Sequence, residues 1–351
     1  MNKVAIMEAR ARADLFSETA ERMNVAEAII EKDFWVCWVL KQLFSNKALE
    51  GRLLFKGGTS LSKIFKAINR FSEDIDLAVD YETLGFNGEN DPRQENISNT
   101  KRNKILGKMM EECQRYIGGE FLDLLGKQCR EILGAGHGWG LEVSKDDENV
   151  VLFHYPAAST KRLAYLTPQV ILELGTHAEF VPRDRFAIRS FAGEHFPKVV
   201  VDNEVPVVAL LGKRTFWEKV TILHVEYHRP EDKQIPDRYS RHFYDVAMMA
   251  EGKIKDEALA DRELLAQVVK HKETFYSSGW ARYDLAKAGS LRLVPPENRR
   301  GALEQDYKKM AMMIFGDPPS FGWILDRLAK LENEINKQPA PARRPARKAT
   351  T

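Results

Sequence analysis

Two aspartates separated by one residue, Asp74 and Asp76, are the strongest candidates for chemistry in this sequence. They open an alternating polar and apolar run that ends at Val79, and such alternation predicts a β-strand. Both carboxylates then lie on one strand face, about 7 Å apart along the chain, while the apolar residues point into a core. Two carboxylates on one open face repel each other unless a cation lies between them, and oxygen ligands suit Mg²⁺. The pattern therefore predicts a metal site.

A pair of glycines lies shortly upstream of these aspartates. Gly57-Gly58 follows a short apolar run, 52–55, that predicts a buried strand, and helical spacing extends from Thr59 to Ile68. Glycine lets a backbone approach a ligand closely, and the free N–H groups at the start of a helix hold phosphate. A phosphate cradle beside metal-binding carboxylates is the equipment for phosphoryl or nucleotidyl transfer. The alternative is a plain glycine turn beside two solvated aspartates.

These segments also carry a family resemblance. The runs FKGGTSLSKIF and RFSEDIDLAV resemble the AbiEii/AbiGii toxin family, which includes the MenT toxins, within the DNA polymerase beta-like nucleotidyltransferase superfamily. Two more segments match the family pattern, EKDFWV at Glu31–Val36 and RTFWEK at Arg214–Lys219. The resemblance covers roughly residues 20–255. The resemblance implies nucleotidyl transfer from an NTP. The paired carboxylates and the glycine turn lead us to expect Mg²⁺ at Asp74 and Asp76, with two ions per site.

The resemblance implies roles for individual residues. Metal binding is implied for Asp74 and Asp76, and a phosphate-binding point charge for Lys219. Without the resemblance, Lys219 would be a solvated helix residue. Asp245, in the run RHFYD, matches an active-site aspartate, whereas its spacing alone predicts an ion pair with Arg241 on the same helix face. Contact with the nucleotide is implied for Lys219 and for Lys56, Gly57, Gly58, Thr59 and Ser60.

A third carboxylate is expected on a neighbouring strand. The run 167–174 predicts a strand, and Glu173 is a lone charge within it, which is costly to bury unless it is paired or metal-bound. The superfamily resemblance implies that this residue completes the catalytic and metal-binding set. Glu142, in another strand-like run, is its competitor. The alternative for Glu173 is an exposed edge position on an alternating face.

A dense apolar stretch precedes the glycine pair. Asn24 and Glu27 resemble a capping pair for a helix that extends to Phe44 and is buried on most sides. We interpret its insert, Glu31–Asp33, as a polar rim, with a site as the alternative. Further helices are expected at 3–22, 100–133, 206–227 and 239–251 and in three segments beyond residue 256, and further strands at 141–143 and 150–155.

Composition sets the broad class of the protein. The 351 residues include 44% hydrophobic and 30% charged residues, and no run reaches the roughly 18 apolar residues of a membrane span. We therefore expect a soluble, cytoplasmic protein without a membrane partner. Three cysteines without metal-like spacing indicate reduced thiols. The net charge is only +2, and four of the basic residues lie in a Pro-rich tail, so nucleic-acid binding requires a local patch.

The predicted fold class is α+β. A small mixed sheet with packed helices forms a nucleotidyltransferase core with N-terminal helices at 1–202, a mostly helical lobe follows at 203–337, and a disordered basic tail occupies 338–351. The predicted function is a Mg²⁺-dependent nucleotidyltransferase toxin that moves NMP from an NTP to an acceptor. The resemblance implies a tRNA 3′ end as the acceptor, a cognate antitoxin and a role in phage defence. The alternatives are a nucleotidyltransferase or kinase for a protein or small molecule, and a non-catalytic nucleotide-binding module.

Overall fold

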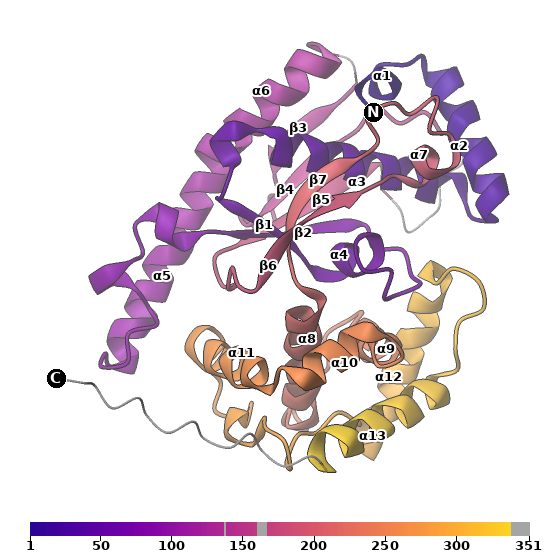
Figure 1. The fold of residues 1–351 in the computed structure, drawn as a ribbon. Coiled ribbons are helices and arrows are strands. Elements are labelled where there is room, and N and C mark those ends of the chain that lie inside the picture. The colour runs from indigo at the N-terminus through magenta and orange to yellow at the C-terminus, as the bar shows by residue number, and fades with distance from the viewer. Residues whose placement is uncertain (137, 160–166, 338–351) are drawn as a thin grey trace. The chain divides into compact units, whose positions relative to one another are not determined.

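The structure is a computed structural model that describes residues 1–136, 138–159 and 167–337. The chain forms two compact units, the first from Met1 to Leu211 and the second beginning at Gly212 (Figure 1). The first unit includes a strand at Val205–Leu210. The expected boundary after residue 202 would have assigned this strand to the helical lobe. The predicted disordered tail at 338–351 lies outside the described residues.

The first unit is organised around a mixed sheet. Its described part holds seven strands in the order β3-β4-β5-β2-β1-β7-β6. Strand β2 pairs antiparallel with β1 and parallel with β5, so sheet and helices together confirm the α+β class. The strands are β1 (Leu53–Lys56), β2 (Asp74–Val79), β3 (Gly140–Val143), β4 (Val150–His154), β5 (Gln169–Gly175), β6 (Arg183–Ile188) and β7 (Val205–Leu210).

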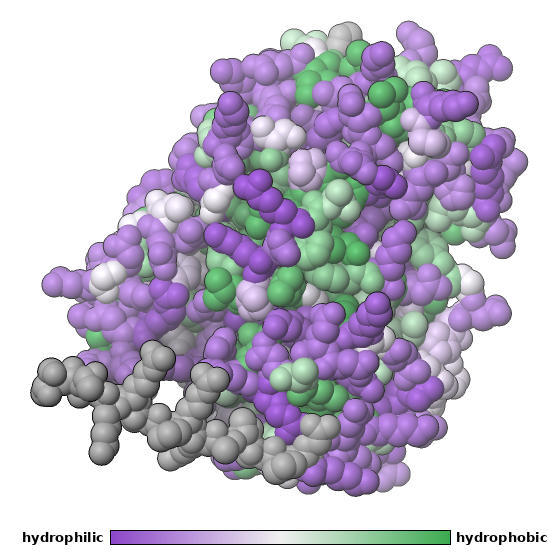
Figure 2. Space-filling model, viewed as in Figure 1, coloured by the Kyte–Doolittle hydropathy of each residue, from purple (hydrophilic) through white to green (hydrophobic). Residues whose placement is uncertain are grey.

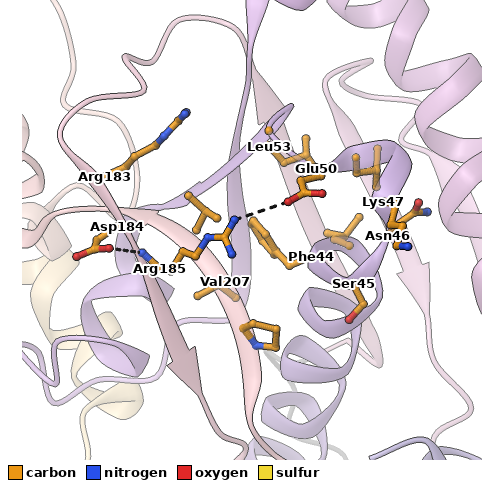
Figure 3. A pocket seen from close by; sticks show the side chains of 15 residues that line it. Phe44, Ser45, Asn46, Lys47, Glu50, Leu53, Arg183, Asp184, Arg185 and Val207 are labelled. Atoms are coloured by element: carbon orange, nitrogen blue, oxygen red, sulfur yellow. Dashed lines mark hydrogen bonds and ion pairs between the residues drawn. The ribbon is translucent and has the colours of Figure 1, made fainter.

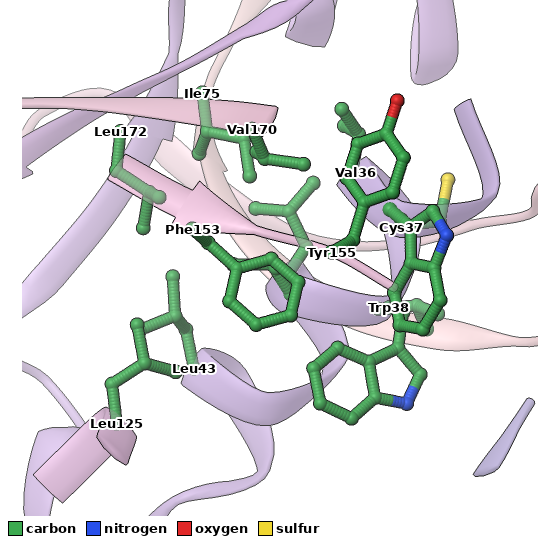
Figure 4. Packing of buried hydrophobic residues seen from close by; sticks show 14 of the residues in the cluster. Val36, Cys37, Trp38, Leu43, Ile75, Leu125, Phe153, Tyr155, Val170 and Leu172 are labelled. Carbon is green, nitrogen blue, oxygen red and sulfur yellow. The ribbon is translucent and has the colours of Figure 1, made fainter. Parts of the chain in front are cut away.

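One face of this sheet packs on helix α3 (Glu27–Ser45), which has almost no exposed side. Figure 4 shows Ile75, Val170 and Leu172 from the strands directed at the side chains of α3. Trp38 of α3 stacks on Phe153 of β4 with ring centroids 5.6 Å apart. Ile75 and the alternate residues of β2 point into the core on this face. The residues between them, including Asp74 and Asp76, therefore point away from α3 on the opposite face. The three cysteines are free and buried.

Other helices of the first unit cover the sheet and α3. Contrary to expectation, the N-terminal helix is broken into two pieces at residues 6–8. Asn24 does not cap α3; it ends the preceding helix in a left-handed conformation with φ +52°, and Ala26 is the N-cap of α3. The helices are α1 (Asn2–Ala5), α2 (Ala9–Met23), α4 (Gly57–Lys63), α5 (Asn99–Tyr116), α6 (Leu122–Leu133) and α7 (Phe191–His195), with a π-helical turn (Ile117–Phe121) joining α5 to α6.

The helix expected at 206–227 is wrong in its first turn and a half. Residues up to Leu210 form strand β7, and helix α8 begins only at Gly212. The run PVVAL is rich in β-branched residues and continues the sheet beside β6. Pro206 is exposed and lies where β7 is not paired with β1, so its missing N–H removes no ladder bond on that side.

The described part of the second unit is helical. Its helices are amphipathic and enclose their own buried residues, among them Phe216, Tyr244 and Leu328. They are α8 (Gly212–Tyr227), α9 (Ser240–Met249), α10 (Lys253–Ala260), α11 (Arg262–Phe275), α12 (Glu297–Met310) and α13 (Phe321–Lys337). In the described parts of both units, no helix combines the length and apolarity that spanning a membrane requires.

Candidate active site

Asp74 and Asp76 emerge from the sheet face opposite α3. Between them, Ile75 is fully buried in the core, so the alternation predicted from sequence is present. The Asp76 side chain is 25% exposed and lies 4.0 Å from the ammonium of Lys56 on the adjacent strand. The open face thus presents two carboxylates and one cation at neighbouring positions.

Strand register decides which glutamate lies beside this pair. Glu173 of β5 is the direct partner of Asp76 in the parallel ladder, and adjacent strands are about 4.8 Å apart. Paired residues share a face, so Glu173 lies next to Asp76 and is exposed. Its strand is interior, between β4 and β2, and not the edge position considered above. Lys56, Asp76 and Glu173 therefore form one row across three strands.

Glu142 occupies a different part of the same face. It belongs to the edge strand β3, and the register connects it through Leu152 and Ile171 to Asp74, three strands away. Its carboxylate lies 3.0 Å from His154 Nε2. Three strand spacings amount to about 14 Å, too far for a shared cation. The fold thus favours Glu173 over Glu142 as the third carboxylate.

The glycine pair is in contact with the acidic strand. Gly57 has φ +79°, and a Cβ at this position would lie 1.7 Å from Asp76 Oδ2, so no larger residue fits. A Cβ on Gly58 would lie 2.8 Å from the Ser72 hydroxyl and 2.9 Å from Arg70 Nη2. Helix α4 starts at Gly57 itself, two residues before the predicted start. The turn and the carboxylates are one packed unit.

The hydroxyls of this turn are directed inward. Thr59 Oγ1 donates to the main-chain oxygens of Asp74, at 2.5 Å, and Ser72, at 3.3 Å. Ser60 Oγ donates to the Gly57 oxygen at 2.9 Å, and both side chains are buried. These hydroxyls tie α4 to β2. A nucleotide at this turn would therefore meet main-chain groups and Lys56 more readily than the Thr59 and Ser60 hydroxyls.

Glu31, Lys32 and Asp33 are not the polar rim that we expected. All three are buried, with residue exposures of 3%, 0% and 2%. Lys32 Nζ lies 2.5 Å from Glu73 Oε2, and the Asp33 carboxylate pairs with Lys63 and accepts from the Phe191 N–H at 2.7 Å. The apolar residues on both sides of the run, which leave α3 no solvent face, were the signal for burial.

Glu31 makes the third set of contacts of this run. Its two carboxylate oxygens accept from the main-chain N–H groups of Ala158, at 2.6 Å, and Ser159, at 3.1 Å. Burial raises the pKa of Glu31, and these two hydrogen bonds and the nearby Arg12 oppose that rise. Charged groups are found this deep only when they are paired or hydrogen-bonded, and each member of the run meets that condition.

The two predicted site residues of the second unit meet each other. Lys219 Nζ of α8 lies 2.8 Å from Asp245 Oδ2 of α9, with side-chain exposures of 9% and 0%. The Lys219 ammonium is also 3.5 Å from His242 Nδ1. The expected partner from spacing, Arg241, is one turn away on the same helix, but the ammonium that reaches Asp245 comes from another helix. Lys219 is therefore a buried cation oriented by Asp245, and not the solvated lysine that its helix position alone predicts.

The donors on β2 fit a metal that takes part of its ligands from a substrate. Within the described residues, no group of three or more His, Cys, Asp or Glu side chains lies close enough together to hold a metal ion by itself. Mg²⁺ does not require one, because it is usually held by one or two carboxylates plus substrate phosphates and water. Asp74 and Asp76 on one face, with Glu173 in register, are a donor set of this kind.

A separate pocket of about 620 Å³ lies at the other end of β1 from Lys56. It is enclosed by the end of α3, the start of β1 and strands β6 and β7, and none of the predicted site residues lines it. Figure 3 shows the Arg185 guanidinium directed at Glu50, 3.7 Å away. Figure 2 shows hydrophobic side chains over the sheet of the first unit and also at its upper edge near α1. The pocket is thus distinct from the acidic row, the name used here for Asp74 and Asp76 of β2 with Glu173 of β5.

Comparisons with known proteins bear on the family and the fold of this chain. A family model described as nucleotidyl transferase AbiEii toxin, type IV TA system, matches residues 38–327. Among solved structures, MenT4, a nucleotidyltransferase toxin from Mycobacterium tuberculosis H37Rv, is similar with a TM-score of 0.51 and 16% sequence identity. The match covers 93% of this chain and 90% of that one. A search of curated proteins gave no match.

Proposed function

This chain belongs to the AbiEii family of nucleotidyltransferase toxins of type IV toxin–antitoxin systems, and we propose that its reaction takes place at the acidic row of β2 and β5. The proposed reaction transfers a nucleoside monophosphate from an NTP to an acceptor hydroxyl. The observation that carries the proposal is the register that places Asp76 beside Glu173, with Gly57 packed against the Asp76 carboxylate.

Asp74, Asp76 and Glu173 are the proposed metal-binding residues, and we expect two Mg²⁺ ions per site. When bound, Mg²⁺ supplies positive charge that polarises the α-phosphate and neutralises the pyrophosphate. The chain contributes rigid orientation, because Thr59 fixes the main chain at Asp74 and Gly57 leaves space for the Asp76 carboxylate. Lys56, Gly57 and Gly58, with the buried Thr59 and Ser60 behind them, form the proposed nucleotide-binding segment.

The proposed step is an in-line displacement. The acceptor oxygen forms a bond to the α-phosphorus while the bond from that phosphorus to the pyrophosphate oxygen breaks. The acceptor proton passes to a carboxylate, for which Glu173 and Asp245 are the candidates. Lys219 is the proposed contact for the phosphates of the nucleotide, and its 2.8 Å contact with Asp245 orients the ammonium.

The proposed acceptor is the 3′ end of a tRNA. This assignment follows the resemblance to MenT-like toxins; blocking that end would prevent aminoacylation and stop growth. We further propose a cognate antitoxin as partner, a role in phage defence, and a cytoplasmic location, where NTPs and tRNA are found.

Labelled nucleotides test this proposal directly. The purified protein is incubated with Mg²⁺, total tRNA and each α-labelled NTP in turn, with Asp76→Ala in parallel. Label in tRNA with the wild type only is the expected result, and it also identifies the nucleotide. Label in a protein would replace the acceptor with a polypeptide. A parallel reaction with γ-labelled NTP tests for a kinase, which would transfer the γ-label and not the α-label. If no label moves, and Asp76→Ala is as toxic in cells as the wild type, the enzymatic proposal is wrong.

A further inference from the structure

We propose that Lys32 and Asp33 of α3 are positioning residues that set the geometry of the catalytic segment without touching the substrate. The inference rests on the proposed function of the acidic row. The catalytic segment is defined here as residues 57–74, from the first glycine of the turn to the first aspartate of β2. One helix, α3, contacts this segment at two points, the last residue of α4 and the residue just before Asp74.

The first contact is made next to the metal-binding strand. Lys32 Nζ is 2.5 Å from the carboxylate of Glu73, the residue that immediately precedes Asp74, and 3.4 Å from the main-chain oxygen of Thr167, two residues before β5. The Lys32 side chain is fully buried and that of Glu73 is 8% exposed. One ammonium therefore touches the entries of both strands that carry the acidic row.

The second contact is made at the far end of α4. The Asp33 carboxylate pairs with Lys63, the last residue of that helix, and their side chains are 2% and 8% exposed. Lys63 Nζ also donates to the Arg189 main-chain oxygen at 3.1 Å and lies 3.6 Å from the centre of the Phe191 ring. Helix α4 begins at Gly57, so fixing its last residue fixes the direction of the whole turn.

Successive residues of a helix are rotated by about 100°, so Lys32 and Asp33 reach different elements from one backbone. The Thr59 hydroxyl bonds to the main-chain oxygens of Ser72 and Asp74 connect the chain on both sides of Glu73 to helix α4, which ends at Lys63. An apolar pair could fill the same space, since buried ion pairs add little net stability. What an ion pair adds is a fixed direction, which a metal site needs to within a fraction of an ångström.

Paired substitutions test the proposal without leaving a lone buried charge. The variants are Lys32→Met/Glu73→Gln and Asp33→Asn/Lys63→Met, each compared with Arg12→Met. Arg12 is a matched control because it is a buried cation that donates to the main-chain oxygens of Ala5, Met7 and Pro156, outside the catalytic segment. Thermal unfolding reports the fold of each variant, and the EPR signal of free Mn²⁺ reports metal binding independently of activity.

We expect both double variants to fold, to bind Mn²⁺ about 10-fold more weakly or worse, and to lose about 10- to 100-fold in kcat at saturating NTP. Arg12→Met should lower the melting temperature while keeping Mn²⁺ binding within about 2-fold of the wild type, the variation we allow for a purely structural change. If Lys32→Met/Glu73→Gln fails to fold, Glu73→Gln alone replaces it, since Lys32 can still donate to the amide oxygen. If Asp33→Asn/Lys63→Met fails to fold, Asp33→Asn alone replaces it, since Lys63 can still donate to the amide oxygen. A smaller loss in the same two quantities is expected.

Two results would overturn the inference. The first is a folded double variant whose Mn²⁺ affinity and kcat match the wild type, since the buried pairs would then be structural only. The second is a wild type that binds no Mn²⁺, which removes the metal site and the positioning role together. A wild type that binds Mn²⁺ but transfers no nucleotide contradicts the proposed reaction alone, and weaker Mn²⁺ binding in the variants would still support positioning.

Discussion

Two short charged runs of the first unit have opposite surroundings. Asp74–Asp76 stands on an open sheet face, whereas Glu31–Asp33 is enclosed within the core helix α3. In the open run like charges are neighbours, with Glu173 in register beside Asp76. In the buried run every charge has a partner of opposite sign or two N–H donors. Neighbouring carboxylates on an open face are an arrangement for a ligand, and paired buried charges are an arrangement for orientation.

The largest effect should come from removing one charge of the open run. Asp76→Asn keeps the shape of the side chain and the space beside Gly57, but lowers the affinity for a cation. We expect nucleotide transfer to fall by about 10³-fold, the upper range for loss of one transition-state contact. The free energy of unfolding should change by only about 0.5 kcal/mol, since Asp76 is partly exposed and its 4.0 Å contact with Lys56 is weak.

Single-turnover transfer and urea unfolding measure these two quantities on the same preparation. A decrease of several kcal/mol in the free energy of unfolding of Asp76→Asn would show that the open run stabilises the fold. The open run and Glu31–Asp33 would then not differ in role.

The opposite behaviour is expected for the buried run. Lys32→Met alone leaves the Glu73 carboxylate, 8% exposed, without the ammonium now 2.5 Å away. Breaking one side of such a pair should reduce the free energy of unfolding by about 3–5 kcal/mol, while Lys32→Met/Glu73→Gln should recover most of that loss. Urea unfolding with an unchanged m-value would measure it. A single variant as stable as the double one would mean that Glu73 has sufficient partners without Lys32.

The sequence predicted the open run more completely than the buried one, for a physical reason. Strand alternation is a local property, so Asp74, Asp76 and the core residue Ile75 could be assigned to faces from spacing alone. Whether a polar insert in an apolar helix faces water depends on what packs around that helix. Lys32 pairs with Glu73, and Asp33 pairs with Lys63. Both partners lie tens of residues away in the chain, so no local sequence pattern indicates the pairing.

The remaining differences have a similar origin. Register across β2 and β5 places Glu173, and not Glu142, beside Asp76, and register is a tertiary property that neither run contains. Strand β7 appeared helical because Pro206 suits the first turn of a helix, yet it equally suits a strand position without a ladder bond on one side. The Lys219–Asp245 contact joins two helices whose separate patterns indicated only surface residues.

Substitutions of Glu173 and Glu142 test which of these two glutamates acts together with Asp76. Glu173→Gln should reduce transfer by about 10- to 100-fold, whereas Glu142→Gln should leave it within about 2-fold, because only Glu173 adjoins Asp76. Both side chains are exposed, so both variants should retain wild-type stability to about 0.5 kcal/mol. Transfer measured across a Mg²⁺ titration would separate a metal ligand from a general base, since only the former shifts the half-saturating concentration. Equal losses in the two variants would contradict the register argument.

The smallest effect concerns the pH dependence of the buried run. Burial raises the pKa of Glu31 above its ordinary value of 4.5, so the folded protein binds this proton more tightly than the unfolded chain. The contribution of Glu31 to the free energy of unfolding is therefore largest at low pH and declines as pH rises from 4.5 through the raised pKa, by at most about 1.4 kcal/mol per pH unit.

Glu31→Gln removes this titration while one amide oxygen can still accept from Ala158. We expect the stability difference, wild type minus variant, to decrease with pH in that interval in a series of urea unfolding curves. Parallel pH profiles would mean that the hydrogen bonds from Ala158 and Ser159 fully offset burial, and that Glu31 is ionised as readily in the core as in the unfolded chain.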